Sequence, residues 1–158
     1  MKKLLLLLFT TITFISCSET VEAERIPWTS KSEEAKIIFD QFLMNQEIRR
    51  ATPEGQEKLM DSILKLDPNF ALGKINTSWG WPNTTRDEVR KNLLSAYEDR
   101  ESVSDLEKRL IVANFEAFIN GNGVRFDEIL DSLVNDYPQY YQLRLWSGTS
   151  KNDLQNPK

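Results

Sequence analysis

Histidine is absent from this 158-residue chain, and cysteine occurs once, as Cys17. The absence of histidine excludes catalytic sites of the Ser-His-Asp and Cys-His types. It also excludes zinc sites that need imidazole, and one thiolate cannot supply the several sulfur ligands of the remaining zinc sites. One cysteine allows no disulfide within the chain, so stability must come from a packed core. We therefore expect no catalytic residue, no metal site and no cofactor, and a protein that is not an enzyme.

The chain also lacks an apolar run long enough to cross a bilayer. Its most apolar stretch, residues 4–15, has about a dozen residues, whereas a spanning helix needs about 20. This stretch follows Lys2 and Lys3 and ends at Ser16-Cys17, which is the layout of a cleaved signal peptide. Strict alternation of apolar and polar residues is missing as well, so we predict no significant sheet.

The junction Phe14-Ile15-Ser16-Cys17 resembles the lipobox of bacterial lipoprotein signal peptides. The resemblance implies that residues 1–16 are removed and that Cys17 becomes the lipidated first residue of the mature chain. Two or three acyl chains give durable anchoring, so the protein would be held in the bacterial cell envelope. Because Ser18 follows the cysteine, the enterobacterial sorting rule favours the outer over the inner membrane. The alternative is an ordinary secretory signal in which the cysteine is incidental.

Negative charge is in modest excess. Without residues 1–16 the chain has 18 basic and 24 acidic residues, a net charge of −6 over 142 residues. That length fits one domain. Nucleic acid and anionic bilayers attract clustered lysine and arginine, so we expect no nucleic acid partner. Some acidic residues occur as pairs, which is a pattern seen in glycosidases and metal sites. These pairs lie at predicted helix ends or on exposed faces, and the helix dipole favours acidic residues near helix starts.

Composition divides the mature chain into three parts. Residues 17–30 are polar and acidic, which predicts a flexible tether between the lipid and the fold. Residues 31–147 carry apolar positions at helical spacing, which predicts an all-α domain of about seven helices. Residues 148–158 are polar, which predicts a disordered tail after a last helix that spans about residues 139–146.

Helix boundaries can be placed from capping residues and prolines. Capping boxes are predicted where a serine or threonine precedes a glutamate by three residues, namely Ser30 with Glu33, Thr85 with Glu88 and Ser104 with Glu107. Pro53 suits the first turn of a helix, and Pro68 and Pro138 end the helices before them. A short helix is expected over residues 69–79. The helix after Ser104 is apolar on two faces, so it should lie in the middle of the stack.

Two stretches match when the chain is shifted by 70 residues. Residues 57–64, EKLMDSIL, align with residues 127–134, DEILDSLV, and Pro68 aligns with Pro138. The shift is close to twice the 34-residue period of tetratricopeptide (TPR) repeats. Residues 66–71, LDPNFA, resemble the junction between two such repeats, and residues 106–138 resemble one whole repeat. This resemblance covers about residues 32–146 and implies a short TPR-like helix-turn-helix solenoid. The small residue of the family's second helix is replaced by Ile63 and Leu133.

The resemblance also implies where ligands would bind. In TPR-like proteins the first helix of each repeat contributes the contacts of the inner groove. In this chain the polar candidates on those helices are Gln41, Asn45, Asn76, Asn114 and Asn120.

The most unusual cluster is Trp79-Gly80-Trp81-Pro82. Indole rings offer a large rigid contact area, which suits a sugar ring or a peptide. The same rings could instead plug the joint between two helix pairs, with Trp79 inside and Trp81 more exposed. The sequence favours the packing role.

These patterns favour a membrane-anchored lipoprotein that acts as an interaction scaffold for a peptide or for another envelope protein. Stacked helix pairs present an extended concave surface, which suits this role. The alternative is an accessory lipoprotein at the cell surface that binds a glycan or another nutrient through Trp79 and Trp81. The oligomeric state stays open.

Overall fold

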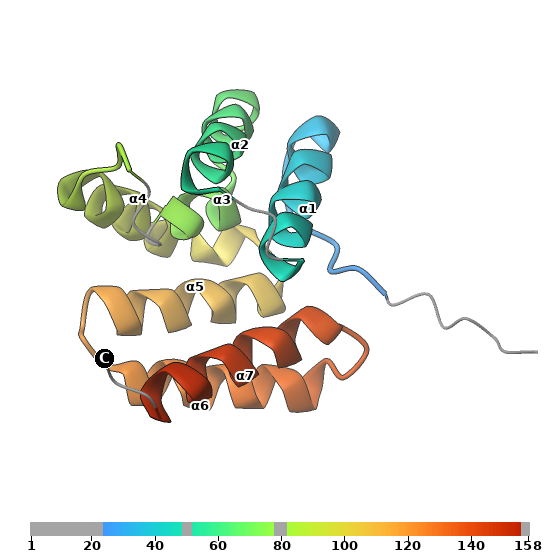
Figure 1. Ribbon diagram of the computed structural model, residues 1–158, viewed down its shortest axis with the longest axis vertical. Coiled ribbons are helices and arrows are strands. Elements are labelled where there is room, and N and C mark those ends of the chain that lie inside the picture. Colours follow the sequence, from blue (N-terminus) through green and yellow to red (C-terminus); the bar gives the residue numbers. More distant parts are fainter. Residues whose placement is uncertain (1–23, 49–51, 78–81, 156–158) are drawn as a thin grey trace, which may run out of the picture.

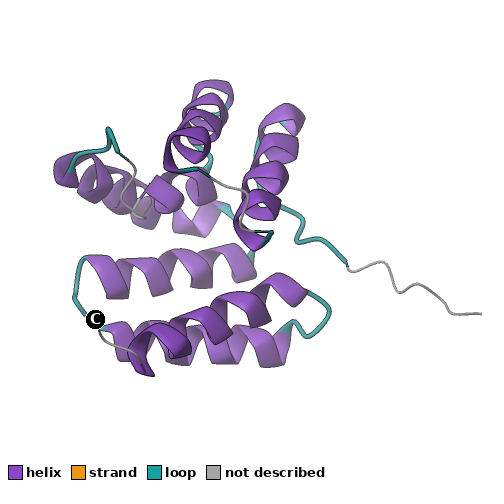
Figure 2. Ribbon diagram, in the orientation of Figure 1, coloured by secondary structure: helices purple, strands orange, loops and turns teal. Residues whose placement is uncertain are grey.

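The computed structural model describes residues 24–48, 52–77 and 82–155 of the chain. Within these ranges the chain forms seven α-helices and no β-strand, which confirms the predicted all-α fold (Figure 2). The helices are α1 Glu33–Glu47, α2 Pro53–Leu66, α3 Ala71–Asn76, α4 Arg86–Glu98, α5 Asp105–Phe118, α6 Gly123–Asp136 and α7 Tyr141–Gln155. A 3-10 turn, Arg100–Ser102, precedes α5. None of the described helices is both long and apolar enough to span a bilayer.

The helices stack as antiparallel neighbours along the chain. α1 packs on α2, α3 on α4 and α5 on α6, and α7 packs on α6 (Figure 1). As predicted from its two apolar faces, α5 lies in the middle, between α6 on one side and α3 and α4 on the other. Its buried side chains include Leu106, Leu110, Ile111 and Ala113. The apolar core therefore runs through the whole array.

Capping explains where most helices begin. At Thr85 with Glu88, and at Ser104 with Glu107, both reciprocal hydrogen bonds of a capping box are present, as predicted. The predicted box of Ser30 with Glu33 is wrong. Ser32 caps α1 instead, because its side chain accepts the backbone N–H of Ala35 at 3.1 Å.

The two ends of the array are linked. The hydroxyl of Tyr141, in the first turn of α7, donates to Oε2 of Glu47 at the end of α1, at 2.7 Å. These residues are 94 positions apart in the sequence. The array is therefore curled enough for its first and last helices to be in contact.

Two predicted boundaries differ from the structure. α3 begins at Ala71, two residues later than predicted, and its path beyond Thr77 falls outside the described residues. The predicted disordered tail from residue 148 is wrong up to Gln155, because α7 continues that far. Gly148 lies inside this helix, and one glycine costs only about 1 kcal/mol in a helix, which is not enough to end it.

The larger difference is at the amino-terminal side of α1, in residues 24–31, which we call the strap. These residues form no helix, yet Ile26 and Trp28 are 3% and 4% exposed. The Trp28 ring meets the edge of Phe39 at a centroid distance of 5.1 Å, and its Nε1 donates to Oδ1 of Asp40 at 3.0 Å. The prediction that the flexible tether extends to residue 30 is therefore wrong for residues 24–30, since their apolar side chains belong to the core.

Two carboxylates hold the strap against the helices. Asp67, the C-cap of α2, accepts the hydroxyl of Ser30 at 2.6 Å and the backbone N–H of Lys31 at 2.9 Å. Glu107 of α5 accepts the backbone N–H of Thr29 at 2.7 Å and also the hydroxyl of Thr29. Glu107 is fully buried and accepts from Ser104 as well, so one carboxylate caps α5 and binds the strap.

The packing of the strap gives a first prediction. Trp28→Ala should lower the free energy of unfolding by about 3–5 kcal/mol, the usual cost of emptying a large aromatic site in a core. Chemical denaturation monitored by circular dichroism measures this. Pro27→Ala, at the exposed neighbour, is the matched control and should change stability by less than about 1 kcal/mol. Equal and small effects of both substitutions would contradict the packed strap.

The hydrogen bonds of Asp67 give a second prediction. Burial acts to raise the pKa of Asp67, but the hydrogen bonds from Ser30, Lys31 and Asn69 outweigh it and lower the pKa below the ordinary value of 3.8. The charged form therefore stabilises the folded state fully above about pH 4, and this stabilisation is lost as the pH falls through the lowered pKa.

Asp67→Asn should accordingly cost about 1–3 kcal/mol at pH 7 and less at pH 2.5. Urea denaturation at the two pH values measures the difference. Asp61→Asn, at an exposed carboxylate of the same helix, serves as the control. A cost for Asp67→Asn that does not change with pH would contradict the role assigned to its charge.

Candidate functional site

A polar hollow of about 440 Å³ lies between α2 and α4. Its walls come from α2, from the end of α3, from the loop before α4 and from α4 itself. The residues that line it are Glu57, Asp61, Leu64, Thr77, Asn83, Thr84, Glu88, Lys91 and Asn92. We call it the α2–α4 hollow. Only one of these nine side chains, that of Leu64, is aliphatic.

The loop on one side of the hollow is fixed by a buried carboxylate. Glu57 on α2 is 8% exposed and accepts both the backbone N–H and the side-chain Nδ2 of Asn83, at 2.8 and 2.7 Å. Two hydrogen bonds from one residue hold the loop in a single position against α2. The wall that this loop provides is therefore built by specific contacts.

The opposite wall is ordered by α4 and α3. The backbone N–H and the hydroxyl of Thr85 both donate to Oε2 of Glu88 at 2.8 Å, and these bonds lower the pKa of Glu88. On α4, the Nδ2 of Asn92 donates to the hydroxyl oxygen of Thr77 at 3.1 Å. The hollow thus combines a fixed set of hydrogen-bonding groups with an ionised carboxylate.

Acidic groups dominate the charge of the hollow. Glu57, Asp61 and Glu88 contribute carboxylates, whereas Lys91 is the one basic side chain in the lining. Asp61 is exposed on α2, one turn after Glu57, so its charge is accessible at the mouth. Such a surface attracts lysine, arginine or another cation.

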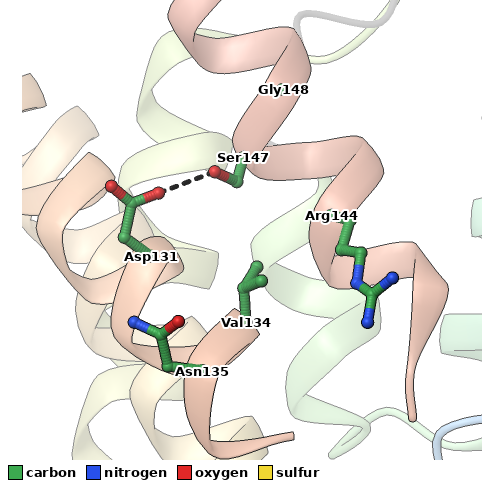
Figure 3. A pocket seen from close by; sticks show the side chains of 6 residues that line it. All are labelled: Asp131, Val134, Asn135, Arg144, Ser147 and Gly148. Carbon is green, nitrogen blue, oxygen red and sulfur yellow. Dashed lines mark hydrogen bonds between the residues drawn. The ribbon is translucent and has the colours of Figure 1, made fainter. Parts of the chain in front are cut away.

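A second hollow lies between α6 and α7, and polar side chains in its lining are already hydrogen-bonded within the protein. Figure 3 shows the side chains that line it. The hydroxyl of Ser147 donates to Oδ1 of Asp131 at 2.7 Å, and the guanidinium of Arg144 donates to the carbonyl oxygen of Pro138 at 2.8 Å. Arg144 points away from Asp131 in this view, so the two charged groups do not converge on a common ligand position.

Three of the residues predicted from the sequence lie outside the described residues. These are Cys17, the predicted lipidation position, and Trp79 and Trp81 of the aromatic cluster. Lipidation of Cys17 and a binding role for the two tryptophans stay predictions.

The other predicted binding residues lie on α1, α3 and α5 and in the turn after α5. Gln41 is exposed on α1, Asn45 is half-buried one turn later, and Asn120 is exposed after α5. Asn76 and Asn114 each donate through Nδ2 to the backbone carbonyl four residues earlier, Leu72 and Leu110 respectively.

Asn114 is also 8% exposed, so its amide is buried inside the array. The predicted binding role of these residues stays untested.

The α2–α4 hollow was not predicted from the sequence. Glu57 and Asn83 are 26 residues apart, and their contact depends on the path of the chain through α3. The one available signal was the capping box of Thr85 with Glu88, which places α4 but says nothing of α2.

Among the described residues no group of three or more acidic or cysteine side chains is arranged to hold a metal ion. Comparison of the chain with protein-family models, with curated proteins and with solved structures finds no match.

Proposed function

We propose that this chain is a lipid-anchored docking scaffold that binds a basic, extended segment of another envelope protein in the α2–α4 hollow. The observation that carries the proposal is the hollow itself, whose polar and mainly acidic lining is held in place by hydrogen bonds from Asn83 and Thr85. The chain would act by binding and would not catalyse a reaction. Its anchor would be the acyl chains on Cys17, in the outer rather than the inner membrane.

The chemistry of the hollow favours a polypeptide over a small molecule. Sites for small ligands are mostly apolar and enclose most of the ligand, with a few polar groups for orientation. Here the lining is polar except for Leu64, and about 440 Å³ accommodates one or two long side chains. A peptide backbone can exchange hydrogen bonds with Asn83, Thr84 and Asn92, while its lysine or arginine meets the carboxylates.

The repeat pattern supports the same role. Helix-turn-helix arrays present long surfaces to polypeptide partners, and the 70-residue match makes such an array the simplest reading of the chain. This support is an analogy of fold, which is a weaker guide than the site itself. The glycan-binding alternative depends on Trp79 and Trp81, which lie outside the described residues.

A third prediction tests the hollow. A photoreactive amino acid placed at position 61 in the full chain should give a covalent adduct with a partner in intact cells. The same amino acid at position 98, on α4 but outside the lining, should give no such adduct. The adduct should map to a lysine- or arginine-rich segment of the partner.

Charge reversal gives the matched comparison. Asp61→Lys should weaken capture of that partner about tenfold, whereas Glu98→Lys, which is also exposed, should leave it unchanged. Raising the salt concentration should weaken the wild-type interaction, since the contacts are ionic and accessible. Equal labelling at positions 61 and 98, or equal capture by both charge variants, would contradict the proposed site.

A further inference from the structure

One side of α1 carries three exposed apolar side chains, with the exposed polar Gln41 between two of them. Ile37, Met44 and Ile48 are 68%, 47% and 50% exposed, and their spacing of seven and four residues places them on one side of the helix. We call these three side chains the apolar face of α1. The buried residues of the same helix, which include Phe39 and Phe42, lie on the opposite side. Exposed apolar side chains grouped on one surface are one mark of a site that meets a membrane or another protein.

The strap leads the chain out of the domain beside this helix. The guanidinium of Arg25 pairs with Asp40 of α1 at 3.1 Å, and Trp28 bonds the same carboxylate. Figure 1 shows the strap running along α1 at the edge of the molecule, with α4 on the far side of α2 and α3. The residues that precede Glu24 therefore start from the α1 edge of the array.

The length of chain before the strap then limits how far α1 can be from the membrane. Seven residue steps separate Cys17 from Glu24, and a fully extended chain spans at most about 3.6 Å per residue, or about 25 Å in total. α1 has 15 residues and is therefore about 22 Å long. A lipid on Cys17 would keep α1 within roughly its own length of the bilayer.

We propose that, in the lipidated protein, the apolar face of α1 rests in the interfacial layer of a zwitterionic phospholipid bilayer. This inference rests on the proposed lipid anchor. Glu33 and Glu34 are exposed at the start of the same helix, so attraction to anionic lipids does not contribute. Three side chains bind a membrane weakly, but the anchor raises their effective concentration at the bilayer and makes the contact persistent.

This contact would set the orientation of the domain. The α2–α4 hollow is lined from α2, the end of α3 and α4, and α4 lies on the far side of α2 from α1 (Figure 1). A partner could then reach the hollow without meeting the bilayer.

The test uses the full chain, acylated in cells and reconstituted into phosphatidylcholine vesicles. Because lipidation consumes the thiol of Cys17, Met44→Cys provides the only free thiol for a nitroxide spin label. Val124→Cys, at a 70% exposed apolar residue of α6, is the matched control. Power saturation then measures how accessible each label is to oxygen and to a water-soluble nickel chelate.

We expect the label at position 44 to lose nickel accessibility several-fold in vesicles and to gain oxygen accessibility, while the label at position 124 keeps the values of a water-exposed site. In the unacylated Cys17→Ser background both labels should behave alike. Circular dichroism confirms that each labelled chain is folded.

Mass spectrometry of the same preparations distinguishes a failure of the lipid anchor from a failure of the membrane contact of α1. If Cys17 carries acyl chains and the labels at 44 and 124 are equally accessible to nickel, the membrane contact of α1 is overturned and the anchor stands. If Cys17 carries none, the proposed anchor fails and the contact fails with it.

Discussion

The arrangement of this chain depends most on the hydrogen bonds that the carboxylate of Glu107 accepts. It is fully buried, and it accepts hydrogen bonds from Ser104 at the start of α5 and from Thr29 in the strap. A buried charge is costly unless its hydrogen bonds are complete, so the strap and the α5 cap stabilise each other. Asp67 makes the equivalent contacts at the end of α2. The strap is therefore an integral part of the helical array.

Because the strap is part of the array, the domain would have less freedom to move around a membrane anchor. A tether that reached residue 30 would let the domain move freely around its anchor. A strap that is bonded to the helices from Arg25 onward leaves a short connection and places α1 at the edge where the chain enters the fold. The apolar face of α1 points away from the core, and the polar α2–α4 hollow is lined from α2, α3 and α4. In the proposed anchored scaffold the first would meet lipid and the second a partner.

Local signals were enough to predict the helices. The capping boxes of Thr85 and Ser104 and the prolines at helix ends act within a few residues, so they can be read directly from the sequence. The strap was missed because its partners are distant: Glu107 is 78 residues from Thr29, and Asp67 is 36 residues from Lys31. The site was missed for the same reason, since Glu57 and Asn83 meet only after the chain has passed through α3. Residues 148–155 were misjudged because polar composition does not by itself end a helix.

Amide hydrogen exchange tests most directly whether the strap folds with the helices. The backbone N–H groups of Thr29 and Lys31 donate to Glu107 and Asp67. They should therefore exchange as slowly as the amides in the middle of α1, with rates that approach the global unfolding limit. Exchange at the rate of an unstructured peptide at both positions would show that the strap is free, and would contradict its place in the core and the membrane orientation proposed from it.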